Sequence, residues 1–165
     1  MQTQDAGIGM SLKYSEKVDL SNILFVRMRP KEEIRGKLEE VVSENGFKRA
    51  AVLSAIGSVY DATFYGVKPN SQLPYVQDQI TVVRKEGPFE VLTLEGNIFP
   101  MGERLIPHLH ITLGAHDGSV IGGHLDRATV YTTIELFLAE IRSCSAVKHR
   151  DEVAGGIQIK LPIGN

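Results

Sequence analysis

The sequence HLHITLGAHDGSVIGGH, residues 108 to 124, constrains the fold of this chain more than any other segment. Side chains of a β-strand alternate between two faces, so His108 and His110 share one face while the intervening aliphatic side chains point to the other. Asp117-Gly118 is a hairpin signal, and an extended apolar pattern resumes at Val120. The stretch therefore predicts a β-hairpin with one imidazole face and one aliphatic face.

The length of the hairpin loop decides where a third histidine lies. A loop of two or four residues would pair Ile111 with His124 and place His124 on the aliphatic face. A three-residue loop, 116 to 118, with Gly118 in the left-handed conformation, pairs His110 with His124 instead. We favour the second register because it also places aliphatic residues opposite one another, Leu113 with Ile121 and Leu109 with Leu125.

In that register His108, His110 and His124 form a candidate metal site. Directly opposed residues have Cβ atoms roughly 4.5–5.5 Å apart, from which three imidazoles can converge on one ion. Zn²⁺ is the default metal for three histidines with an open position. Gly122 and Gly123 would leave room for an approaching ligand. Histidines on the open face of a sheet can also be merely solvated, and the sequence leaves this alternative open.

Two carboxylates are candidate neighbours of the site. Alternation over residues 89 to 97 places Glu90 on the face of Leu92 and Leu94, either in solvent at the strand's end or buried with a partner near a site. Glu135 faces the same way as Thr133 and Phe137 and could accept a hydrogen bond from a histidine, although an exposed strand glutamate is the commoner case. Of the other histidines, we expect His116 to be exposed in the turn and His149 to lie in a charged loop.

The remaining patterns predict an α+β fold: a compact single domain with a curved, largely antiparallel or mixed sheet and one main helix. Residues 1–20 are expected to form an N-terminal arm and residues 21–165 the domain. A helix is predicted over 31–45, where Glu32 and Glu33 would occupy the first turn. Strands are predicted over 23–29, 48–57, 59–67, 79–83, 89–97, 129–139 and 157–161, with a turn at 86–88.

Composition excludes several classes of protein. The 165 residues are 42% hydrophobic, which suits one domain, and the net charge of −2 offers no electrostatic footprint for nucleic acid. The single cysteine, Cys144, and the lack of an apolar leader point to the cytoplasm. No apolar run approaches the roughly 20 residues needed to cross a bilayer. One helix cannot cover such long apolar strands, so some sheet surface is expected to meet another copy of the chain.

Four segments together resemble the plants-and-prokaryotes-conserved domain, the domain of plant AT-hook nuclear proteins and of many bacterial proteins. They are AAVLSAIGSV at 50–59, GPFEVLTLEG at 87–96, HLHITLG at 108–114 and DGSVIGGHL at 117–125. The resemblance implies a homotrimer, with metal in some prokaryotic members at the histidines that are His108, His110 and His124 here. Family members are often labelled DNA-binding, but the plant AT-hook word is absent from this chain. The plant-type GRFEI word reads Gly87-Pro88-Phe89-Glu90-Val91 here, without its arginine.

These observations predict a metal-binding homotrimer, with zinc as the metal and a regulatory, DNA-associated role. Its expected partners are further copies of itself and DNA or a DNA-bound protein, with no membrane. One alternative is a small metalloenzyme, whose base would be Glu90, Glu95 or Glu135; no catalytic residue is identified from sequence. The other alternative is direct DNA binding through basic residues that a trimer would gather on one surface, Arg84, Lys85, Arg142, Lys148 and Arg150.

Overall fold

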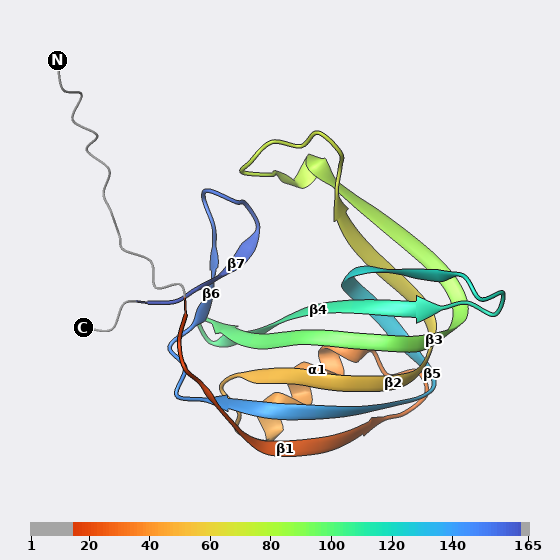
Figure 1. Ribbon diagram of the computed structural model, residues 1–165, viewed down its shortest axis with the longest axis horizontal. Helices are drawn as coiled ribbons and strands as arrows, with labels where there is room; N and C mark the ends of the chain where they lie inside the picture. The colour runs from red at the N-terminus through yellow and green to blue at the C-terminus, as the bar shows by residue number, and fades with distance from the viewer. Residues whose placement is uncertain (1–14, 163–165) are drawn as a thin grey trace.

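The computed structural model describes residues 15–162, which form a single domain of mostly antiparallel sheet with one α-helix (Figure 1). The predicted α+β class is therefore confirmed. In chain order the elements are β1 (Asp19–Met28), α1 (Ile34–Glu44), β2 (Ala50–Val67), the 3₁₀ turn η1 (Gln77–Gln79), β3 (Ile80–Met101), β4 (Arg104–Gly114), β5 (Val120–Arg142), β6 (Val147–Arg150) and β7 (Ile157–Lys160). The predicted N-terminal arm falls largely outside the described residues. No helix within 15–162 has the length and apolarity to cross a membrane.

The main sheet has the strand order β1-β5-β2-β3-β4, and every pairing in it is antiparallel. The first residues of β5 pair with β4, and its later residues pair with β2 and β1. Strands β2, β3, β4 and β5 thus close a ring, which requires the sheet to curve strongly. In Figure 1 the strands β4, β3, β2, β5 and β1 follow one another down the view, and α1 appears between β3 and β2.

The core lies inside the curved sheet and beneath α1. Leu109, Ile111 and Leu113 of β4 are buried at 0–2% exposure, so the aliphatic face predicted for this strand is its core face. Helix α1 adds Ile34, Leu38 and Val42, all at 0% exposure, at the spacing of one helical face. The histidine face of β4 consequently points away from the core.

Helix α1 is shorter than predicted because Glu33 is its N-cap rather than a residue of its first turn. The Glu33 carboxylate accepts hydrogen bonds from the backbone N–H groups of Arg35 at 3.1 Å and Gly36 at 2.8 Å. A carboxylate at this position satisfies N–H groups that have no partner inside the helix. The helix ends close to the predicted boundary, with Asn45 as its C-cap.

The predicted turn at residues 86–88 is wrong, because β3 runs through this segment without interruption. Val59 pairs with Phe89 and Asp61 pairs with Glu86, so two residues of β3 oppose the single residue Tyr60. This arrangement is a β-bulge, which accommodates Gly and Pro and bends the strand without ending it. Figure 1 shows β3 changing direction along its course, and β2, predicted as two strands, is also continuous.

A second bulge in β3 changes which side chains face the core. The register with β4 shifts between Val91 and Thr93, so alternation is interrupted at Leu92. Val91 and Leu94 are buried while Glu90 is exposed, in place of the strict alternation expected. After the bulge, Glu95 and Asn97 lie beside the histidines of β4, with Glu95 opposite His110 and Asn97 opposite His108.

The predicted loop around His149 is also wrong, since residues 147–150 form β6 and pair with β7 in a separate two-stranded sheet. The β6–β7 hairpin contacts the segment between β2 and β3 through Tyr75. The Tyr75 backbone N–H donates to the Ala154 carbonyl at 3.2 Å. A Cβ on Gly156 would lie 1.9 Å from the Tyr75 hydroxyl oxygen, so this glycine permits the close contact.

Candidate metal centre

The hairpin joining β4 to β5 has the three-residue loop predicted from its sequence. The Ala115 N–H donates to the Ser119 carbonyl at 2.9 Å, and Gly118 adopts a φ of +83°. His110 therefore lies directly opposite His124, and Leu113 opposite Ile121. The register that places three imidazoles on one face is confirmed.

The imidazoles of His108, His110 and His124 converge. One nitrogen from each ring lies within 4.8 Å of the other two, and Nε2 of His108 is 3.2 Å from Nε2 of His110. Two nitrogens held about 2.0–2.1 Å from a tetrahedral zinc ion would lie roughly 3.3–3.4 Å apart. The spacing of these two atoms already matches that requirement. The donor set of three imidazoles and the geometry both fit zinc.

Burial and nearby charge keep two of these histidines neutral. Desolvation, followed by the positive charge of Lys148, lowers the pKa of His108 to about 4. Desolvation is also the largest cause of the lowered pKa of His124, followed by the charges of His110 and Arg35. Neutral imidazole is the form that binds a metal ion, so at neutral pH neither His108 nor His124 must lose a proton first.

A hydrogen-bonded group from α1, β2 and β5 holds the strands beneath the histidines. Arg35 Nη1 lies 3.3 Å from Asp126 Oδ1, and this guanidinium also donates to the carbonyls of Asp126 at 3.0 Å and Pro107 at 3.5 Å. Asp126 interacts with the Tyr65 hydroxyl and is the largest cause of the raised pKa of this phenol. The Tyr65 ring stacks on His124, with centroids 6.1 Å apart and planes 23° apart. These contacts fix residues next to His108 and His124.

A shallow pocket lies on the β3 side of the histidines. It is lined by Glu95, Gly96, Asn97, His108 and His110. The Asn97 Oδ1 atom is buried and has no hydrogen-bond partner among the described residues. A buried acceptor without a partner costs free energy, and this one belongs to a residue that lines the pocket.

Lys148 of β6 is a second buried polar residue near the histidines. It is 4% exposed, and in residues 15–162 its ammonium has neither a hydrogen bond nor an ion pair. Its positive charge contributes to the lowered pKa of both His108 and His124, and burial lowers the pKa of Lys148 itself. Lysine is seldom buried without a partner.

Of the other residues predicted for the site, the two glutamates lie away from the histidines, whereas Gly122 and Gly123 directly precede His124 in β5. Glu90 is exposed and lies opposite Ser58 and Gly114, four positions from His110 in the register. Glu135 lies opposite Arg27 and Ile56.

Gly122 lies opposite Thr112, where a Cβ would meet the Ile111 carbonyl at 2.4 Å, so this glycine allows β4 and β5 to approach each other closely. A Cβ on Gly123 would only touch Phe64. His116 is exposed in the loop, and His149 Nε2 lies 3.4 Å from Asp151 Oδ2.

Sequence reasoning missed Asn97, Arg35, Tyr65 and Lys148 as neighbours of the centre. The β3 bulge brings Asn97 and Glu95 to the histidines, and a bulge leaves no reliable mark in a sequence. Tyr65 is opposite His124 in the β2–β5 register, a contact between distant parts of the chain. Lys148 sits in a basic segment that local patterns assign to a loop.

The chain shares its fold with several solved structures. A plant- and prokaryote-conserved protein from Pyrococcus horikoshii matches with a TM-score of 0.74 and 20% identity, over 87% of this chain and 96% of that one. A metal-containing protein from Archaeoglobus fulgidus matches with a TM-score of 0.74 and 25% identity, over 86% and 95%. A protein from Bacteroides thetaiotaomicron, for which DNA binding is suggested, matches with a TM-score of 0.73 and 23% identity, over 87% and 97%.

Sequence comparison gives both a longer relative and a family. The chain is 27% identical over 137 residues to the bifunctional protein GlmU of a Synechococcus strain, which covers 82% of this chain. The chain spans about a fifth of the length of that curated relative. The sequence profile of the Plants and Prokaryotes Conserved (PCC) domain matches residues 15–142, which include all three clustered histidines. This chain belongs to the PCC domain family.

Proposed function

We propose that this PCC domain binds one zinc ion through His108, His110 and His124, and acts as a homotrimer in a regulatory role associated with DNA. The observation that carries the proposal is the convergence of three ring nitrogens within 4.8 Å, two of them 3.2 Å apart. Support also comes from the similarity to the metal-containing protein of Archaeoglobus fulgidus. The proposed location is the cytoplasm, on the basis of the single cysteine.

Elemental analysis of protein purified without an affinity tag tests the metal site. We expect about one zinc ion per subunit in the parent and little in His108→Ala or His124→Ala, because two imidazoles bind zinc far more weakly than three. His149→Ala is the matched control and should keep its zinc, since His149 pairs with Asp151 instead. A parent that stays free of metal after incubation with zinc would exclude the site.

The homotrimer proposal is supported by apolar side chains on the outer face of the sheet. Phe25 is 61% exposed, Ile56 60% and Phe137 47%, and the rings of Phe25 and Phe137 contact each other at a centroid distance of 5.3 Å. Contiguous apolar surface on a soluble protein usually marks an interface. Phe137 lies between Leu136 and Leu138, which are fully buried, so it projects from the opposite face of β5.

We expect sedimentation equilibrium to give a mass of about 55 kDa, three times the 18.2 kDa of one chain. Phe137→Lys should shift the protein toward monomer, because a charge buried in an apolar interface has no partner. Val153→Lys is the control, since Val153 is 78% exposed on the β6–β7 hairpin. A parent that sediments as a monomer at micromolar concentration would rule out the trimer.

Association with DNA is proposed through a partner protein. The similarity to a Bacteroides protein for which DNA binding is suggested supports a role near DNA. The net charge of −2 argues against strong direct contact, because affinity for the phosphate backbone depends on lysine and arginine neutralising its charge.

The position of Glu95 favours a second candidate function, that of a small metalloenzyme. Glu95 lies opposite His110 and lines the same pocket, whereas Glu90 and Glu135 lie away from the histidines. Held by His108, His110 and His124, a zinc ion would supply an acidified water. Glu95 would then be the carboxylate that accepts a proton from this water.

A further inference from the structure

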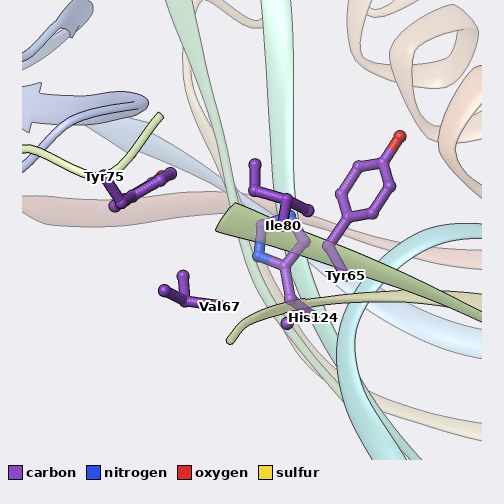
Figure 2. A pocket seen from close by; sticks show the side chains of 6 residues that line it. Tyr65, Val67, Tyr75, Ile80 and His124 are labelled. Atoms are coloured by element: carbon purple, nitrogen blue, oxygen red, sulfur yellow. The ribbon is translucent and has the colours of Figure 1, made fainter. Parts of the chain in front are cut away.

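A cavity next to His124 is distinct from the shallow pocket beside His108 and His110. It measures about 230 Å³ and is lined by Tyr65, Gly66, Val67, Tyr75, Ile80 and His124. Figure 2 shows Val67, Tyr75 and Ile80 gathered around the imidazole of His124, with the Tyr65 hydroxyl pointing away from them. That hydroxyl is engaged by Asp126, so Tyr65 offers the cavity its ring. Apart from the imidazole, the side chains present mainly hydrocarbon and ring surface.

The size of the cavity limits its occupant. Sites for drug-sized molecules measure roughly 300–1,000 Å³, so about 230 Å³ suits a ligand with one small ring or a short chain. Two tyrosine rings and two aliphatic side chains favour a flat, apolar body.

Positive charge near the histidines determines which chemical group the other end of the ligand carries. Lys148 is 4% exposed, and no acceptor or carboxylate in residues 15–162 pairs with its ammonium. Its charge reaches both His108 and His124. A zinc ion on neutral imidazoles would add further positive charge, and an open coordination position near the Lys148 charge favours an anion.

We propose that this site binds a small monocarboxylate with one planar ring, its ring in the Tyr65–Tyr75–Ile80 cavity and its carboxylate between the three-histidine metal ion and Lys148. The inference rests on the proposed zinc site and adds the chemical class of its ligand. Lys148 acts here as the partner of the anion, and His124 belongs to both the cavity and the metal centre.

Isothermal titration of zinc-loaded protein with benzoate tests the inference. Benzyl alcohol, which has the ring without the charge, and acetate, which has the charge without the ring, should each bind at least tenfold more weakly. Lys148→Met should weaken benzoate binding by roughly 10- to 100-fold, because it removes one charged partner. Val67→Phe should weaken it similarly by filling the cavity. Lys160→Met, on the paired strand of the same hairpin, is the control and should leave the affinity unchanged.

The zinc content of every variant is measured before titration, so the two proposals fail separately. A parent without zinc overturns the metal site and this inference with it. A zinc-loaded parent that does not bind benzoate overturns the ligand alone. Equal benzoate affinity in the parent and in a zinc-loaded, folded Lys148→Met or Val67→Phe also overturns it. Weakening confined to those two variants, with Lys160→Met unchanged, supports it.

Discussion

Replacing Gly96 with alanine is expected to destabilise the protein strongly and to disturb the metal centre as well. A Cβ at this position would lie 2.0 Å from the backbone oxygen of His108, and Gly96 has a φ of +150°. Overpacking costs about 1–3 kcal/mol and the backbone conformation about 1–3 kcal/mol more. We therefore expect urea denaturation of the metal-free variant to show a free energy of unfolding lower by roughly 3 kcal/mol or more. Zinc affinity should fall too, because the clash moves His108.

Substitutions at two other glycines separate the loss of stability from the loss of zinc affinity. Gly57→Ala creates an equally close contact, 2.0 Å from the Thr133 backbone oxygen, on the β5 side of β2. It should cost similar stability while the folded fraction keeps its zinc affinity. A Cβ on Gly66 would meet nothing within 4 Å beyond its chain neighbours, so Gly66→Ala should be nearly neutral. Equal zinc affinity in the parent and in folded Gly96→Ala would contradict the proposed link between Gly96 and His108.

The metal-free protein is expected to lose stability as the pH falls from about 6.5 to about 4. The pKa of His108 is near 6.5 when the chain is unfolded and about 4 when it is folded. In this window the unfolded chain takes up a proton that the folded chain does not, so protonation favours unfolding. At 1.36 kcal/mol per pH unit, His108 contributes at most roughly 3 kcal/mol, and the lowered pKa of His124 acts in the same direction.

Urea denaturation at a series of pH values measures this dependence. His108→Gln cannot titrate here, so its free energy of unfolding should change less with pH than that of the parent. Parallel curves for the two proteins would show that His108 is not the group responsible. His116→Gln is the control for a histidine that is exposed in the loop, and it should follow the parent.

The cluster of three histidines could be predicted in detail because it depends on local structure. The Asp117-Gly118 turn sets the loop length, and loop length with strand alternation places His108, His110 and His124 on one face. Neither step needs knowledge of the distant parts of the chain. The same reasoning located α1, although it placed Glu33 inside the helix and missed its role as the N-cap.

Strand pairing between distant parts of the chain determines the features that local sequence patterns could not predict. The turn predicted at residues 86–88 is a bulge, because β2 pairs with β3 on both sides of it. The bulge at Leu92 brings Glu95 to His110 and leaves Glu90 outside, although strict alternation treats both as plausible neighbours. Lys148 is near the histidines only because the β6–β7 hairpin folds back, and a short basic segment carries no sign of that contact.

The order in which the chain folds follows from the same division between local and distant contacts. All three histidines belong to one hairpin, and hairpins form in roughly 1–10 μs. By contrast, Ser21 and Glu140, which join β1 to β5, are 119 residues apart. Loop-closure entropy delays such contacts. An isolated hairpin is only marginally stable in water, and a bound ion would stabilise it. Zinc present during synthesis would therefore speed folding, whereas zinc added later would act only on the finished domain.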